Sequence, residues 1–207
     1  MPLPMVHLSV AVLAEKTLGI EDRCAYYLGS IAPDGIHMLE QWTVEDKKRS
    51  HLGVRGTDDP SGVMAFLASD AAKSNRDYSV GYALHCLTDL YWNVQIMKIF
   101  DGCYQKEPCP VLTSREAYYS DTDQIDIHLY HTMSERKELW SLLEKSQGVD
   151  LPGVLSAKAA ELWNKRTLRW YDQERTFSIP ITYIALQAVS DFLPKASRYC
   201  VKMIQKA

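Results

Sequence analysis

His85 and Asp89 are the residues whose types and spacing first suggest chemistry. They interrupt an otherwise apolar stretch at residues 81–92, GYALHCLTDLYW, which we predict to be part of a buried helix. Residues four apart lie on the same helix face, and a buried carboxylate without a partner costs several kcal/mol or takes up a proton. Two interpretations are open: the two side chains bond to each other, or they bind a divalent metal together.

Other candidate ligands occur earlier in the chain, and each also has a plainer interpretation. His7 falls in the first turn of a predicted helix, where a histidine is usually a cap or a surface residue. Asp34 and His37 follow the end of the next predicted helix, where an aspartate often forms a local turn bond and where loops commonly carry function. His51 comes after the basic residues 47–49, which form either a solvated face or an anion-binding rim.

A second group of possible ligands lies further along the chain. His128, His131 and Glu135 occur at i, i+3 and i+7 in a predicted helix at residues 121–145, close to Asp126. This spacing places the three on one face and suggests a second metal cluster. Their polar surroundings favour an exposed face instead.

Hydrophobic periodicity predicts the elements that position these residues. We expect an all-α, single-domain bundle of about seven helices covering residues 1–207, without a convincing strand. Pro180 and Pro194 each mark the beginning of a helix near the C-terminus, the first opening at Ser178. Residues 101–120 are predicted to be a loop long enough to act as a lid. The main helices before that loop are predicted at residues 4–18, 21–31, from 59 onward, and 76–100.

Composition limits the function classes. The net charge of −3 gives no overall attraction for nucleic acid or an anionic membrane. No apolar run approaches the ~18 residues that cross a bilayer, and the N-terminal residues do not resemble a signal peptide. Five cysteines without a CxxC pair favour reduced thiols. We therefore expect a cytoplasmic protein with no nucleic-acid partner and no stable membrane insertion; its oligomeric state stays open.

The order of the candidate ligands resembles the zinc-dependent phospholipase C family, which consists of all-helical hydrolases. In that family an N-terminal histidine, an aspartate at a helix-end turn and a histidine after a loop precede a helix with His-x-x-x-Asp. The likeness covers residues 1–95 well and includes small bacterial members of the group. The segments that carry it are PMVHL at residues 4–8, YLGSIAPD at 27–34, KRSHL at 48–52, and residues 81–92.

The resemblance implies a metal set of His7, Asp34, His51, His85 and Asp89. Within it, Asp89 is expected to bridge two ions and Asp34 to act on the attacking water. Secreted phospholipases also use a mature N-terminal Trp and a further histidine shortly after the helix aspartate, and this chain has neither. We therefore expect one or two ions, zinc or another first-row divalent metal such as manganese, and a substrate other than a phospholipid.

Three functions follow from these residues. The first is a metal-dependent hydrolase that attacks a small phosphoester with a metal-activated water. The second is a helical metal-binding or interaction protein that keeps the site without a reaction. The third is an enzyme like the HD-type phosphohydrolases, although the chain lacks an adjacent His-Asp doublet.

Overall fold

The computed structural model describes residues 3–54, 57–172, 177 and 179–207, and across these residues the chain is all-α with no strand. A 3₁₀ segment, η1 (Ala32–Met38), and a π segment, η2 (Asn93–Met97), join some of the helices. The α-helices are α1 (Pro4–Leu18), α2 (Arg23–Gly29), α3 (Val44–Ser50), α4 (Ser61–Ala68), α5 (Asp70–Ser74), α6 (Arg76–Trp92), α7 (Lys98–Lys106), α8 (Ser114–Thr132), α9 (Arg136–Lys145), α10 (Ala157–Trp170) and α11 (Leu186–Ile204). The all-α prediction is confirmed.

The predicted number of about seven helices is too low, because polar stretches contain short helices. One of these short helices is α3, which begins with a capping box between Thr43 and Asp46.

The prediction of a loop at residues 101–120 is also wrong. This segment is largely α7 and the start of α8, with a second capping box between Thr113 and Glu116. Both boxes have the Thr-x-x-acid pattern that marks a helix start, so the signal was present in the sequence.

Several predicted boundaries also differ from the structure. The central helix α6 ends at Trp92 and passes through η2 into α7. The helix predicted at 121–145 is two helices, since the chain leaves α8 at Met133. Near the C-terminus, α11 is one helix that begins at Leu186 and contains Pro194. Ser178, where a helix was predicted to open, lies outside the described residues.

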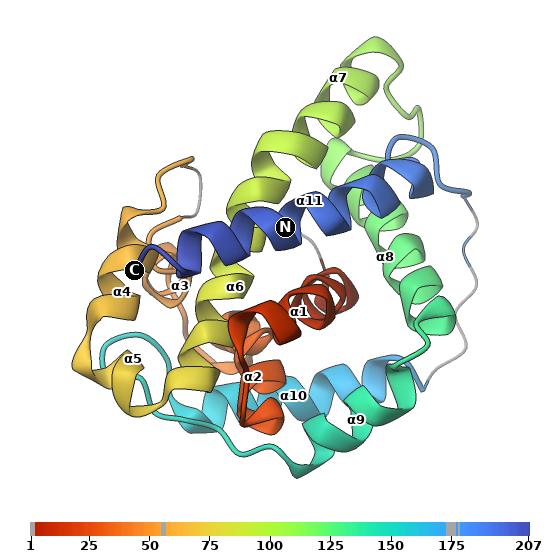
Figure 1. Cartoon of the computed structure of the whole chain (residues 1–207). Helices are drawn as coiled ribbons and strands as arrows, with labels where there is room; N and C mark the ends of the chain where they lie inside the picture. The colour runs from red at the N-terminus through yellow and green to blue at the C-terminus, as the bar shows by residue number, and fades with distance from the viewer. Residues whose placement is uncertain (1–2, 55–56, 173–176, 178) are drawn as a thin grey trace.

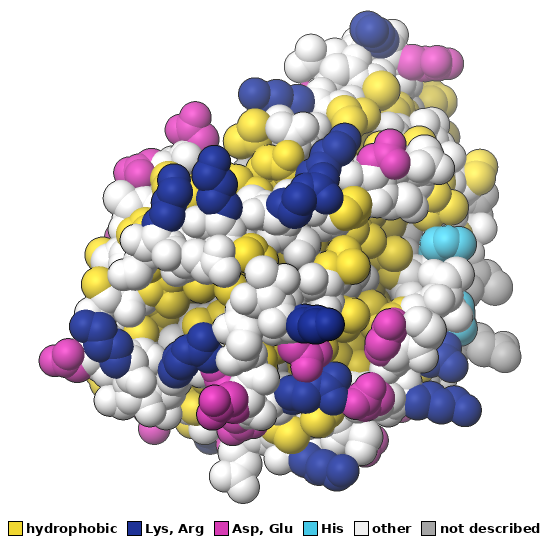
Figure 2. All heavy atoms as spheres, viewed as in Figure 1, with side chains coloured by type: hydrophobic (Ala, Val, Ile, Leu, Met, Phe, Trp, Pro, Cys, Tyr) yellow, Lys and Arg dark blue, Asp and Glu magenta, His cyan; other side chains and the backbone are white. Residues whose placement is uncertain are grey.

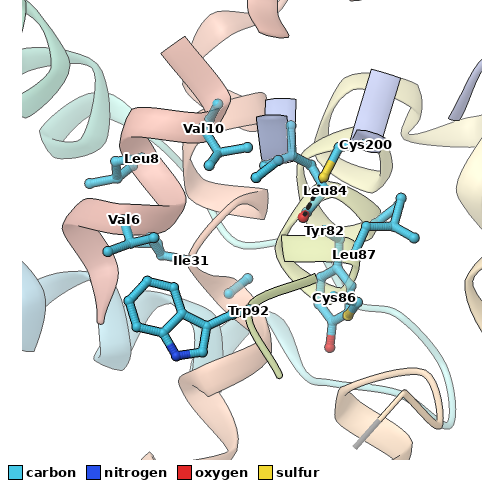
Figure 3. Close-up of a cluster of buried hydrophobic side chains, with 14 of the residues drawn as sticks. Val6, Leu8, Val10, Ile31, Tyr82, Leu84, Cys86, Leu87, Trp92 and Cys200 are labelled. Carbon is cyan, nitrogen blue, oxygen red and sulfur yellow. Dashed lines mark hydrogen bonds between the residues drawn. The ribbon is translucent and has the colours of Figure 1, made fainter. Parts of the chain in front are cut away.

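The core of the molecule is built around α1 and α6. In Figure 1, α11 crosses in front of α6 and passes above α1, and it packs against both helices, while α8 packs against α1. Helix α6 also packs against α2 and α4, so it is buried on nearly every side. Figure 3 draws part of one continuous hydrophobic cluster, including Val6 and Leu8 of α1 and Leu84 and Cys86 of α6. These four are the chain neighbours of His7 and His85, so both histidines sit on core helices.

Two glycines allow the close backbone contacts that bring the candidate ligands together. A Cβ on Gly81 of α6 would lie 2.1 Å from the carbonyl oxygen of Tyr26 on α2, far inside contact distance. A Cβ on Gly35 of η1 would lie 2.8 Å from the carbonyl oxygen of Ala159 on α10. The first close approach brings α2 against α6, and the second brings η1, which carries Asp34, against α10.

Candidate metal centre

Five predicted ligands meet in the core from four separate elements. His7 comes from α1, Asp34 from η1, His51 from the C-cap of α3, and His85 and Asp89 from α6. All are buried, the three histidines completely, whereas Asp34 keeps 6% of its surface exposed. They form two groups whose ligand atoms lie within 4.8 Å of one another: His7, His85 and Asp89, and Asp34, His51 and His85.

The spacing of these atoms suits a shared cation better than direct hydrogen bonds. His51 Nε2 lies 3.4 Å from Asp34 Oδ1 and 3.6 Å from Asp89 Oδ2, and His7 Nε2 lies 3.6 Å from Asp89 Oδ1. Hydrogen bonds between such atoms are normally 2.7–3.2 Å long, whereas two ligands ~2.1 Å from a tetrahedral ion lie roughly 3.4 Å apart. His85 Nε2 and Asp89 Oδ2 are 3.8 Å apart. The interpretation that His85 and Asp89 bond only to each other is therefore wrong.

Several ligand atoms at this centre are buried without a hydrogen-bond partner. Buried polar groups are almost always partnered, because an unsatisfied donor or acceptor costs about 1–3 kcal/mol. A concentration of such atoms at one point therefore calls for a partner that the protein alone does not supply, and a cation is the partner that fits nitrogen and carboxylate donors. The unpartnered atoms are His7 Nδ1 and Nε2, Asp34 Oδ1, His51 Nε2, His85 Nε2 and Asp89 Oδ1.

Backbone carbonyls orient two of the imidazoles. His85 Nδ1 lies 2.9 Å from the carbonyl oxygen of Ser30, and His51 Nδ1 lies 3.0 Å from that of Lys47. A neutral imidazole that donates from Nδ1 keeps a lone pair on Nε2, which is the usual arrangement for a metal-binding histidine. The ring of His7 is instead held by stacking on His85, with centroids 3.7 Å apart.

Burial also sets the charges of the centre. It lowers the pKa of His7 and of His85 below the ordinary value, so both imidazoles are neutral near pH 7. Burial raises the pKa of Asp89 to about 6. Burial acts the same way on Asp34, but the nearby His51 and His85 outweigh it and hold the pKa of Asp34 well below its usual range. In the metal-free centre, His7 and His85 are thus neutral nitrogen donors and Asp34 is a firmly ionised carboxylate.

Asp34 connects the centre to a cleft of about 990 Å³. His37 and Lys47 also line this cleft, and Lys47 Nζ lies 2.6 Å from His37 Nε2. Of the basic residues predicted as either a solvated face or an anion-binding rim, Lys48 and Arg49 are exposed and only Lys47 turns inward. The centre is therefore closed by protein on most sides and opens at the Asp34 side.

The second predicted group does not assemble. His128, His131 and Glu135 are all exposed, and Glu135 lies beyond the end of α8 as the N-cap of α9. Figure 2 shows histidine side chains at the surface on the α8 side of the view. Neither metal-compatible group among the described residues includes any of the three.

Asp126 has a structural position that its sequence context did not indicate. It is buried on α8, accepts a hydrogen bond 2.9 Å long from the backbone N–H of Met5, and also contacts the hydroxyl of Tyr171. It therefore caps the first turn of α1, which has no side-chain cap of its own and which carries His7. Because the partners are 121 residues apart, no local pattern could have revealed the contact.

Comparison with known proteins adds no assignment: no family model, curated protein or solved structure matches this chain. The resemblance to the zinc-dependent phospholipase C family therefore stays a prediction from the order and spacing of the candidate ligands. None of the helices in the described parts of the chain is long and apolar enough to cross a membrane.

Proposed function

We propose that this chain is a metal-dependent hydrolase of phosphoesters, related to the zinc-dependent phospholipase C family. The observation that carries the proposal is the set of buried, unpartnered nitrogen and oxygen atoms that converge beside a cleft. A site with neutral imidazoles and carboxylates suits zinc or another first-row divalent ion. Such an ion supplies Lewis acidity, which withdraws charge from a phosphoryl oxygen and makes a water molecule more acidic.

Asp89 is the ligand best placed to bridge if two ions bind. Its Oδ1 faces His7 and its Oδ2 faces His51 and His85. His85 belongs to both groups of ligand atoms, but its Nδ1 is engaged by the Ser30 carbonyl, so a single nitrogen remains for one ion. We therefore expect His85 to serve one of the two positions and the Asp89 carboxylate to neutralise both.

Asp34 is our candidate for the group that orients the attacking water and accepts its proton. It is the only member of the five ligands that lines the cleft, so a substrate can reach it while the other four stay enclosed. Its Oδ1 has no hydrogen-bond partner and is 3.8 Å from His37 Nε2. A carboxylate within reach of both a cation and a cleft meets the geometric requirement for a general base.

Lys47 supports the choice of an anionic substrate. Its ammonium group, held by His37, adds positive charge to the cleft wall next to Asp34. A cation near the reacting centre stabilises the charge that develops on a phosphoryl group and on its leaving oxygen. The proposed reaction is hydrolysis of a P–O ester bond, with the water oxygen added to phosphorus and the alcohol released.

A direct test is hydrolysis of a 4-nitrophenyl phosphodiester by protein reconstituted with Zn²⁺ or Mn²⁺. We expect slow but measurable release of nitrophenol that depends on the metal and is abolished by a chelator. Protein that holds its metal but is inert toward phosphomonoesters, phosphodiesters and carboxylic esters would contradict the proposal.

One observation favours the second candidate, a metal-binding protein without a reaction. His7, His51 and His85 are completely buried and Asp89 nearly so, and structural metal sites are typically closed whereas catalytic sites keep an open position. The contact of Asp34 with the cleft is the feature that favours the enzyme.

A further inference from the structure

We infer that the cleft binds an extended phosphoester with a second anionic group, distant from the ester that reacts, and that Arg166 receives this group. The inference deepens the proposed function and rests on it. It concerns the wall of the cleft beyond the metal centre, which none of the candidate ligands except Asp34 reaches.

A run of contacting side chains leads from the centre to Arg166 along the wall. Asp34 Oδ1 lies 3.8 Å from His37 Nε2, and the ring centroids of His37 and Trp163 are 6.3 Å apart. The guanidinium carbon of Arg166 lies 4.8 Å from the centroid of the Trp163 ring. All four residues line the same cleft. A ligand whose reacting phosphate is at Asp34 and which follows this wall therefore passes Trp163 and ends beside Arg166.

Within the described part of the chain, no carboxylate forms an ion pair with Arg166. Arg166 is exposed. Stacking on Trp163 fixes the guanidinium over the ring and leaves its N–H groups free to bind a planar or tetrahedral anion. Arg115 on α8 has a similar position, 5.7 Å from the centroid of Tyr119 and without an ion-pair partner in the described chain.

The charges of the cleft as a whole agree with an anionic ligand. Its lining includes the cations Lys47, Arg115 and Arg166 and the carboxylates Asp34 and Asp101. Because Asp34 belongs to the metal centre, the remaining wall has an excess of positive charge. Fields of one sign within a cleft concentrate ligands of the opposite sign.

The surface between the two anion positions is aromatic. Trp163 is 7% exposed, and Trp42, which also lines the cleft, is 38% exposed although it is a large apolar residue. Phe100, Tyr118 and Tyr119 line the cleft as well. We therefore assign the middle of the ligand an apolar or planar character and its far end a phosphate or carboxylate.

The test compares two 4-nitrophenyl phosphodiesters with the same reacting bond. In one, the second ester arm ends in a carboxylate; in the other, the same arm ends in a carboxamide. For the metal-reconstituted protein we expect kcat/KM to be about tenfold higher with the carboxylate arm, the scale of one charge-assisted hydrogen bond. Added salt should reduce this ratio.

Two variants locate the effect. Arg166→Met keeps an apolar side chain over Trp163 but removes the charge, and it should bring the ratio close to one. Arg169→Met is the matched control, because Arg169 is an exposed arginine of the same helix that does not line the cleft; the ratio should stay at the wild-type value. Calorimetry with the non-hydrolysable phosphonate bearing the carboxylate arm should show the same loss of affinity in Arg166→Met alone.

The outcomes separate this inference from the proposed function. Hydrolysis of both diesters with equal kcat/KM, or an unchanged ratio in Arg166→Met, would overturn the second anion position and leave the hydrolase intact. Failure of the metal-loaded protein to hydrolyse either diester would overturn this inference, and inertness toward the wider set of esters named above would overturn the proposed function as well.

Discussion

The chain has a histidine and an acidic residue at i and i+4 twice, once on α6 and once at the end of α8, and the two pairs lie in opposite surroundings. His85 and Asp89 of α6 are buried and meet ligands from three other elements. His131 is exposed near the end of α8, and Glu135 lies beyond it. Spacing thus indicates at most a common face, and burial decides whether that face needs a partner.

The physical reason for this difference is solvation. Water satisfies an exposed imidazole or carboxylate at little cost, so His131 and Glu135 need no ligand. The atoms around His85 are removed from water and still have no hydrogen-bond partner, which costs free energy unless an ion binds. The comparison between the two helices can be tested by changing matched residues on each.

The largest effect is expected for Asp89→Asn. The change removes the charge that neutralises the ion, so metal and stability should be lost together. A metal present at about 1,000 times its Kd stabilises the native state by about 4 kcal/mol, which corresponds to roughly 10 °C in Tm for a chain of this size. Zinc titration and thermal unfolding with and without EDTA would measure both. A variant that keeps its metal would exclude Asp89 as a ligand.

Asp34→Asn should separate binding from turnover. Asparagine has nearly the same shape but cannot accept the proton of a water, so the rate should fall by ~10²–10⁴. We expect much smaller changes in metal content and Tm than for Asp89→Asn. Complete loss of metal in this variant would show that Asp34 is mainly a ligand and that the base is another group.

Metal affinity should depend on pH because Asp89 must lose its proton to bind. Burial raises the pKa of this carboxyl to about 6 in the metal-free protein, while burial lowers the pKa of His7 and His85 and keeps them neutral. Affinity should therefore fall by up to about tenfold per pH unit below 6 and level off above it. Competition titrations between pH 5 and 8 would measure this, and a constant affinity across that range would contradict it.

Protonation of Asp89 also affects the stability of the metal-free protein, and this stability changes with pH in the opposite direction to the metal affinity. The folded-state pKa of Asp89 lies above the value of 3.8 expected for an unfolded chain. The folded state therefore binds more protons between these two values, and stability falls as pH rises from about 4 to about 6. Above 6 this contribution is constant. Metal-loaded protein should lack the decline, because the bound ion replaces the proton.

The smallest effect is expected on α8. The double variant His128→Gln, His131→Gln should change the free energy of unfolding by no more than about 0.5 kcal/mol, as is usual for exposed positions. Its metal content should equal that of the wild type. A drop in stoichiometry would show that α8 binds metal after all, and the contrast with α6 would fail.

The sequence predicted α1 and the core position of α6 well, because apolar residues surround His7 and His85 in the chain itself. It also predicted which five side chains meet, through their order and the His-x-x-x-Asp spacing. It did not distinguish Lys47 from its neighbour Lys48, since adjacent residues on a short helix differ only in the direction they face. That direction depends on η1, which contacts α3 from elsewhere in the chain.

Other features depend on contacts between distant segments, which no local pattern contains. The sequence predicts Asp126 close to a second cluster on α8, whereas its carboxylate caps α1 by accepting a hydrogen bond from the backbone N–H of Met5. The break at Met133 had no Gly or Pro to mark it, so α8 and α9 were predicted as one helix. The stack of Arg166 on Trp163 follows from helical spacing, but its position in the cleft required η1 and α10 to be placed together.

The central claim is that the buried histidines and carboxylates hold a metal, and metal content tests it most directly. Elemental mass spectrometry on protein purified without chelator should find one or two zinc or other first-row divalent ions per chain. His85→Gln should lower that number, because His85 belongs to both groups of ligand atoms, and His131→Gln should leave it unchanged. A metal-free wild-type protein that takes up no Zn²⁺ or Mn²⁺ and whose Tm does not respond to EDTA would contradict the claim.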